Sequence, residues 1–247
     1  MKINNFEFLV IAPSGEQARR YFQSNQNIVT KDGGLPIQAD KLRHQIFKEE
    51  GYVRDDPASH HDTSANDKTW QLVAIDKSSE ELLGCIRFIL FDQKNDIPEA
   101  DRIVKMCGID FEDKKSRTNI VGLIKTHLSN LRKKNKSLMY VGGLAVNSKG
   151  KKLGYGAILG LATNAFMRIV GEAEGITFAQ DYQGGASLFR RLGGYRIKEK
   201  LDSFYSKNHS CNAQLLGLDP LRIDARLESM IKALEDKLRV SKVLTVS

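Results

Sequence analysis

The chain has 247 residues, of which 41% are hydrophobic and 28% charged, with a formal net charge of +8. This length allows one domain with a substantial core, and because no long apolar run or N-terminal h-region is seen we expect neither a membrane span nor a signal peptide. Three widely spaced cysteines, Cys85, Cys107 and Cys211, disfavour a disulfide framework. We therefore expect a single cytoplasmic domain over residues 1–247.

The first half of the chain predicts strands and helices in alternation. Apolar patterning predicts strands at 6–11, 69–76 and 83–91, and helical spacing predicts helices at 16–26 and 39–50. A polar loop at 54–67 contains His60, His61 and Asp62, but no further His or Glu recurs at helical spacing, so we expect no metal site. Trp70 opens a strand, where a core position is favoured over the lining of a substrate pocket.

The second half predicts a helix at 118–136, capped by Thr118 or Asn119, and an apolar strand at 138–146. A helix at 157–170 and a strand at 176–180 follow, and then an extended stretch as far as Leu218. Asp219 as N-cap and Pro220 at the first helical position predict a C-terminal helix over about 219–240.

A basic, glycine-rich turn joins the strand at 138–146 to the helix at 157–170. The first N–H groups of a helix lack internal partners and attract anions, and glycines at 154 and 156 let a ligand approach the backbone closely. Lys149, Lys151 and Lys152 add positive charge. The spacing fits neither a Walker A loop nor a dinucleotide fingerprint, because the residue three after Gly156 is Leu159. The turn predicts a pyrophosphate cradle; glycines that serve only the turn are the alternative.

This turn resembles the coenzyme A-binding motif of the GNAT superfamily of N-acetyltransferases, Arg/Gln-x-x-Gly-x-Gly/Ala. The segment 144–146 resembles the splayed fourth strand of that family, and 187–195 resembles its closing helix-to-strand segment. The resemblance implies an α/β (α+β) fold with a mixed, mostly antiparallel sheet that opens between the fourth and fifth strands. The cofactor-binding residues that it implies are Leu144, Ala145, Val146, Lys151, Lys152, Leu153, Gly154, Tyr155, Gly156 and Ala157.

The segment 42–52 resembles the Leu-Arg-x-x-Val-Phe-x-x-Glu opening of the autoinducer-synthase-like branch of that superfamily. The acidic loop with Asp62 and Asp67, and the strand 84–90, also resemble elements of this branch. Its members move an acyl group from acyl carrier protein or coenzyme A to an amine. Homoserine-lactone synthases have Glu and Arg where this chain has Tyr140 and Gly143. An N-acyl amino acid synthase-like activity is therefore the better match.

The reaction needs a neutral amine, a proton acceptor and donors for the tetrahedral oxyanion. Candidates for the base are Glu50, Asp67 and Tyr140, although each carboxylate could simply be solvated. Arg87 lies within an apolar strand, so we expect a carboxylate partner, either Asp67 or the substrate. Many relatives use a tyrosine at position 189 as general acid, where this chain has phenylalanine. The candidate substrate contacts are Arg43, Phe47 and Trp70, although Arg43 could instead be a surface arginine of a helix.

Coenzyme A or an acyl-phosphopantetheine thioester is the expected co-substrate, with no permanently bound cofactor. The net charge of +8 would suit the coenzyme A phosphates, or an acidic acyl carrier protein as a partner. Basic residues are spread along the chain without an aromatic-rich basic strand or zinc-finger spacing, so nucleic acid is not the expected partner. The alternatives are an acetyl-coenzyme A-dependent N-acetyltransferase and a catalytically silent acyl-coenzyme A-binding module.

Overall fold

The computed structural model describes residues 6–22, 28–30, 34–51, 68–91, 97–171, 173–181, 184–198, 201–207 and 209–245. Its strands are β1 (Phe6–Ala12), β2 (Ile28–Thr30), β3 (Thr69–Asp76), β4 (Leu82–Phe91), β5 (Leu138–Val146), β6 (Glu174–Gln180), β7 (Gly194–Arg196), β8 (Ser203–Ser206), β9 (Cys211–Leu218) and β10 (Lys242–Thr245). Its helices are α1 (Gly15–Tyr21), α2 (Gly34–Glu49), α3 (Ala100–Met106), α4 (Lys114–Lys134), α5 (Ser148–Leu153), α6 (Tyr155–Ile169), α7 (Gly185–Arg191) and α8 (Ala225–Arg239).

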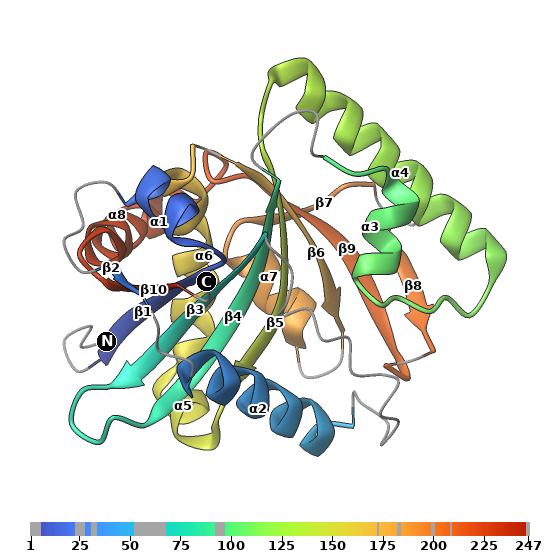
Figure 1. Ribbon diagram of the computed structural model, residues 1–247. Helices are drawn as coiled ribbons and strands as arrows, with labels where there is room; N and C mark the ends of the chain where they lie inside the picture. The colour runs from blue at the N-terminus through green and yellow to red at the C-terminus, as the bar shows by residue number, and fades with distance from the viewer. Residues whose placement is uncertain are drawn as a thin grey trace.

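These strands form one mixed sheet in the order β2-β10-β1-β3-β4-β5-β6-β9-β7, with β8 paired to β9. The pairs β1–β10, β10–β2 and β5–β6 are parallel, and the other pairs are antiparallel. The central strands are apolar on both sides because helices cover both faces, as Figure 1 shows. In β4, Arg87 is the one position between Leu83 and Phe91 that is not fully buried.

The two faces of the sheet carry different helices. Helix α6 is buried along almost its whole length, and it packs with α8 on one face in a core that includes Phe8, Phe88 and Phe166. On the other face, α2 covers a small cluster around Cys85, and α3 and α4 cover a cluster around Ile124. Between α2 and the α3–α4 pair, none of the described helices lies over β4 and β5 on this second face (Figure 1).

Strand β5 contains a bulge that changes which residues face α6. Cys85 pairs with Ala145 and Arg87 with Gly142, so β5 has one extra residue, and Gly143 has a φ of 64°. Val141, before the bulge, and Val146, after it, both face the α6 core. In a regular strand, two residues five positions apart would point to opposite faces. The bulge therefore lets both halves of β5 bury apolar side chains.

Strands β5 and β6 separate just beyond this point. Their parallel pairing runs from Leu138–Glu174 to Val141–Thr177, and both strands continue without pairing to each other. Figure 1 shows the two strands diverging, with α7 near the opening. The predicted opening between the fourth and fifth strands of the family is thus the gap between β5 and β6.

Several predicted boundaries are wrong. Helix α4 begins at Lys114, because the Asp113 carboxylate accepts the Ser116 N–H at 2.8 Å, so neither Thr118 nor Asn119 is the cap. Helix α8 begins at Ala225 with Asp224 as its cap, whereas Asp219 accepts the Leu221 N–H in a separate turn. The sequence patterns also missed α3, α5 and β10. Within the described part of the chain, no helix is both long and apolar enough to cross a membrane.

Candidate active site

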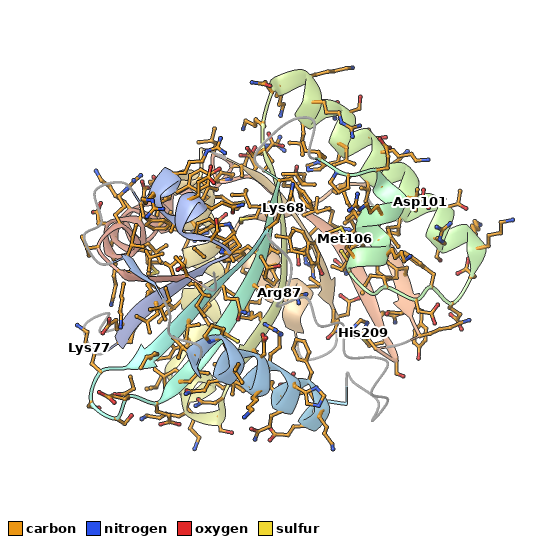
Figure 2. The ribbon with its side chains drawn as sticks, in the orientation of Figure 1. Lys68, Lys77, Arg87, Asp101, Met106 and His209 are labelled. Carbon is orange, nitrogen blue, oxygen red and sulfur yellow. The ribbon has the colours of Figure 1, made fainter. Side chains whose placement is uncertain are left out.

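A cavity of about 1050 Å³ occupies the gap between β5 and β6 and opens on both faces of the sheet. On the α6 face its walls are the α5–α6 junction and α7; on the other face they are α2, α3 and the turn between β8 and β9. Figure 2 shows Arg87 between α2 and Met106 of α3, with His209 farther out. The cavity thus connects the N-terminus of α6 with a charged middle region and an apolar end.

The N-terminus of α6 forms one end of the cavity. Gly154, with a φ of 79°, ends α5 and caps α6, so the predicted loop is in fact a short helix followed by a left-handed turn. A Cβ on Gly156 would meet only Leu188 and Val146, at 3.8 and 3.9 Å. Because this is ordinary contact distance, the fold itself does not require glycine at position 156. The missing Cβ instead leaves room in the cavity beside the first turn of α6, and the first turn of a helix favours anions.

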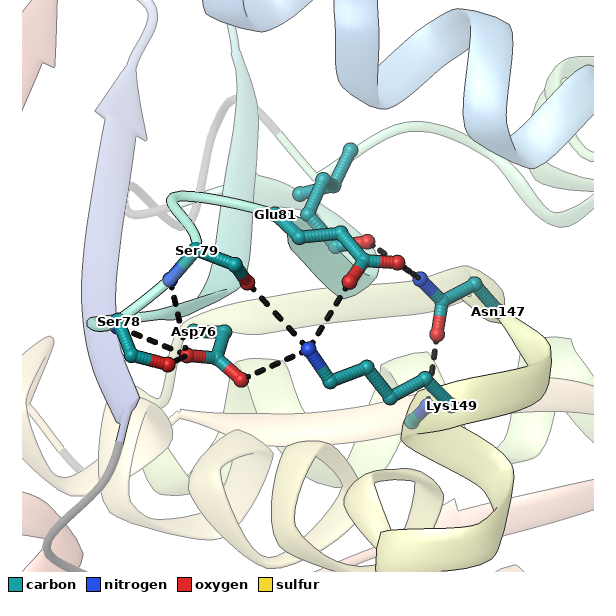
Figure 3. Close-up of polar contacts among 8 residues, drawn as sticks. Asp76, Ser78, Ser79, Glu81, Asn147 and Lys149 are labelled. Carbon is teal, nitrogen blue, oxygen red and sulfur yellow. Dashed lines mark hydrogen bonds and ion pairs between the residues drawn. The ribbon is translucent and has the colours of Figure 1, made fainter.

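The three lysines near this turn point in different directions. Lys149 is held by Asp76 and Glu81, each at 3.0 Å, and belongs to the network with Ser79 shown in Figure 3. Lys151 lines the cavity and forms an ion pair with Glu50 at the end of α2. Lys152 lines a separate shallow groove. Only Lys151 is thus placed to contact a ligand in the cavity.

The structure separates the other predicted cradle residues into two groups. Leu144, Val146, Gly154, Gly156 and Ala157 line the cavity. Leu153 is half exposed outside the cavity, Tyr155 packs against Phe6 with ring centroids 5.1 Å apart, and Ala145 is buried beneath α2. For Leu153, Tyr155 and Ala145 the side chains therefore have structural positions, and only their backbone could reach a ligand.

Two arginines form the charged middle of the cavity. Arg43 on α2 pairs with Asp40, yet its Nη1 is buried without a hydrogen-bond partner, and so is Nε of Arg87 on β4. A Cβ on Gly143 would lie 2.8 Å from Cδ of Arg43 and 3.6 Å from Cβ of Arg87, so glycine makes room for both side chains. Burial, together with the charge of Arg43, lowers the pKa of Arg87. The pair is therefore short of negative charge and of hydrogen-bond acceptors.

The predicted carboxylate partner of Arg87 is not found in the described part of the chain, where Arg87 forms no ion pair. Asp62 and Asp67 lie outside the described residues. Glu50 lines the cavity but is engaged by Lys151. Of the predicted substrate contacts, Arg43 and Phe47 line the cavity, whereas Trp70 is buried in the core against Phe166, with ring centroids 5.4 Å apart. The favoured core position of Trp70 is the one observed.

The far end of the cavity is mainly apolar and surrounds Tyr140. The residues that form it are Met106, Cys107, Ile109, Phe178 and Ala213. The Tyr140 hydroxyl is hydrogen-bonded to Cys107, and burial raises the pKa of Tyr140 well above its usual value. Burial likewise raises the pKa of Cys107 to about 12, so its thiol stays protonated. Sequence patterns missed α3, because this helix is too short for a clear helical repeat. They also missed His209 as a residue of the cavity.

The described residues contain no group of three or more His, Cys, Asp or Glu side chains arranged to hold a metal ion. His60 and His61 lie outside the described residues. The cavity offers instead cationic side chains, the N-terminus of α6 and an apolar end. Such a combination can bind an anionic ligand with an apolar portion and exclude water from it.

No family model and no curated protein matches the sequence. FeeM, an N-acyl amino acid synthase from uncultured soil microbes, aligns over 77% of this chain and 88% of its own, with a TM-score of 0.52 and 12% identity. BjaI, a coenzyme A-dependent acyl-homoserine lactone synthase, covers 97% of this chain and 93% of its own, with a TM-score of 0.49 and 12% identity. Arabidopsis thaliana NAA60 in complex with acetyl-CoA covers 87% and 98%, with a TM-score of 0.47 and 14% identity. The likeness to FeeM confirms the predicted α/β fold, a mixed sheet flanked by helices.

Proposed function

We propose that this chain, with its GNAT acyltransferase fold, transfers an acyl group from a phosphopantetheine thioester to the amine of a small carboxylate-bearing acceptor, such as an amino acid. The observation that carries the proposal is one continuous cavity through the split sheet, which joins the N-terminus of α6, two arginines that each keep a buried nitrogen without a hydrogen-bond partner, and an apolar pocket. Each region suits one part of this reaction.

The donor end suits the pyrophosphate of coenzyme A or the phosphate of a carrier-bound pantetheine. The N-terminus of α6, the open position at Gly156 and the charge of Lys151 would together attract an anion at this end of the cavity. Beyond Val141, β5 no longer pairs with β6, so its exposed edge faces the cavity. Its N–H groups near Leu144 and Val146 would contact the pantetheine arm and the tetrahedral oxyanion.

The acceptor region suits a carboxylate. Arg43 Nη1 and Arg87 Nε are buried donors without partners, and leaving them so costs free energy that an anionic ligand would recover. A carboxylate held there would place a neighbouring amine close to the bulge at Gly143. This region favours an N-acyl amino acid synthase-like reaction over acetylation of a plain amine.

The apolar end supports a donor with a longer acyl chain. An acetyl group needs almost no apolar pocket, whereas the walls around Met106, Ile109 and Phe178 provide apolar surface for several methylene groups. We propose a medium- or long-chain acyl donor, presented by coenzyme A or by an acyl carrier protein. The net charge of +8 would accelerate the encounter with an acidic carrier.

The test compares acetyl and palmitoyl donors, each as the coenzyme A and as the carrier-protein thioester, at two salt concentrations. Acceptors are a mixture of amino acids and, as a matched control, their methyl esters, which lack the carboxylate. We expect N-palmitoyl amino acids by mass spectrometry and little product from the esters. Salt-sensitive turnover of the carrier thioester would identify the carrier as donor. Use of acetyl-coenzyme A alone would indicate an acetyltransferase, and binding without turnover would indicate a silent module.

A further inference from the structure

Aminolysis of a thioester requires one proton to move to the departing sulfur. The amine loses a proton as its C–N bond forms, and the thiolate gains one as its C–S bond breaks. Phe189 lines the cavity on α7, and a phenylalanine ring has no proton to give. If the proposed function holds, another group of this chain is free to take that role.

The hydroxyl of Tyr140 lies where the arginine region of the cavity meets its apolar end. Tyr140 is on β5, just before the bulge, and its side chain runs along the strand so that a Cβ on Gly142 would be 2.8 Å from its Oη. Its ring centroid is 6.3 Å from that of Phe178, the first residue of β6 beyond the last pair with β5. Because the acyl chain is proposed to lie in the apolar end and the acceptor beside the arginines, the thioester carbonyl and the amine would meet near this hydroxyl.

The groups around this hydroxyl match a proton donor. Cys107 at the end of α3 is hydrogen-bonded to it and is itself an uncharged thiol. Burial raises the pKa of Tyr140, so the phenol is protonated at neutral pH, while the charge of Arg87 acts in the opposite direction. Arg87 would therefore stabilise a phenolate that forms for a short time during the reaction.

Other cavity residues with exchangeable protons suit the role less well. Thr177 and Ser187 carry aliphatic hydroxyls, whose alkoxides are far less stable than a phenolate. His209 lies on the β8–β9 turn, where its Nδ1 is 2.9 Å from Ser206 Oγ. It lines the cavity at its outer end, so we include it in the test.

We propose that Tyr140 is the general acid of this acyl transfer, and that Arg87 stabilises its conjugate base. As the C–S bond breaks, the Tyr140 O–H gives its proton to the sulfur. The phenolate then takes a proton from the newly acylated nitrogen, which returns the tyrosine to its starting state. The products are an amide and a free thiol, and no other reactant is needed.

The test depends on how easily the thiol leaves. Octanoyl thioesters of N-acetylcysteamine and of trifluoroethanethiol differ in the acidity of the thiol, and the more acidic thiol leaves without a proton. With octanoyl-coenzyme A or the N-acetylcysteamine ester and a mixture of amino acids, Tyr140→Phe should lower kcat by about 100-fold or more, with little change in KM. With the trifluoroethanethiol ester, most of that loss should disappear.

The matched control is Tyr195→Phe. The Tyr195 hydroxyl also lies against a glycine, since a Cβ on Gly217 would be 2.7 Å from it, and burial raises its pKa to about 12. Tyr195 does not line the cavity, so this variant should behave like the wild type. Cys107→Ala keeps the hydroxyl but removes its partner, and should give a smaller loss with the same dependence on the leaving group.

Three results would overturn the proposal. Unchanged kinetics of Tyr140→Phe would exclude it as the acid, and an equal loss with both thioesters would make its role structural. If His209→Gln, and not Tyr140→Phe, loses kcat with the N-acetylcysteamine ester but not with the trifluoroethanethiol ester, then His209 is the general acid. These results leave the proposed function standing if the wild type forms amides, whereas a wild type that transfers no acyl group would remove both proposals.

Discussion

Arg43 and Arg87 both lie against Gly143, and each keeps one buried guanidinium nitrogen without a hydrogen-bond partner. Two like charges this poorly compensated do not stabilise a fold, since burial and mutual repulsion both act against them. Such an arrangement persists where a ligand supplies the missing anion. The pair is thus the part of the cavity where function and stability make opposite demands.

The first prediction concerns Arg87→Met. It should raise the acceptor KM by at least about 30-fold, because a buried charge-assisted contact is worth about 2 kcal/mol or more. The free energy of unfolding should stay the same or rise, since a desolvated charge is removed. Steady-state kinetics and urea unfolding check both parts. Arg117→Met, which removes an arginine paired with Asp101 at the surface, is the control. A large loss of stability with normal kinetics would make Arg87 structural.

The second prediction separates folding from binding at the helix end. Gly156 and Gly122 are both helical glycines with room for a Cβ, but only Gly156 lines the cavity. Alanine at either position should stabilise the protein by up to about 1 kcal/mol, because glycine is a poor helix former. Gly156→Ala should weaken coenzyme A binding, and Gly156→Val should abolish it, whereas Gly122→Ala should bind normally. Calorimetry that finds unchanged binding to Gly156→Val would refute the assignment.

The third prediction distinguishes two adjacent lysines. Lys151 lines the cavity and crosses to Glu50, whereas Lys152 faces a different groove. Lys151→Ala should weaken coenzyme A binding several-fold, and the difference should shrink at high salt, because a screened charge contributes less. Lys152→Ala should have a smaller effect at every salt concentration. Equal losses in the two variants would mean that the lysines act only through overall charge.

Local sequence patterns predicted the parts of the fold that depend on near neighbours. The strands at 69–76 and 138–146 were recognisable as apolar runs, because helices cover both faces of the sheet there. The N-terminus of α6 was recognisable from its glycines. The first helical turn of α4 was missed because its polar residues carry no apolar stripe, although Asp113 followed by Ser116 was a readable cap. The bulge at Gly143 and the strand β10 depend on distant partners, Arg43 and β1, which no local pattern contains.

The candidate site was predictable to a similar extent. Arg87 stood out as a charge within an apolar strand, and Gly156 stood out from its spacing. The cavity places Cys107 next to Tyr140 through α3, a short helix that sequence patterns did not indicate. The start of a strand favoured a core position for Trp70, which is observed, and its alternative role as a substrate contact is wrong.

The fourth prediction concerns the length of the acyl chain. Ala213 on β9 is almost fully buried and lines the apolar end of the cavity. Ala213→Phe should fill that end, so turnover of a palmitoyl donor should fall by about 10-fold or more. The reason is that each methylene group that no longer fits an apolar pocket costs about 1–3 kcal/mol of transition-state binding. Turnover of an acetyl donor by the same variant is the internal control. An equal decrease for both donors would indicate that the acyl chain lies elsewhere.

The fifth prediction concerns the pH dependence of stability. His127 on α4 is buried and its Nε2 has no hydrogen-bond partner; burial lowers its pKa below 6.5, and the charge of Glu174 opposes this only in part. Below pH 6.5 the unfolded chain binds a proton that the folded chain does not, so stability falls by up to about 1.4 kcal/mol per pH unit from this residue. Above pH 6.5 the residue contributes no pH dependence.

His127→Leu should therefore flatten the decline in the free energy of unfolding as the pH falls from 6.5, and it should leave the stability at pH 8 similar or higher, because an unpaired polar nitrogen is removed. Urea unfolding of the wild type and the variant at a series of pH values measures this difference. If the two curves stay parallel from pH 8 down to pH 5, then His127 takes up a proton in the folded state as readily as in the unfolded chain, and its burial does not limit stability in acid.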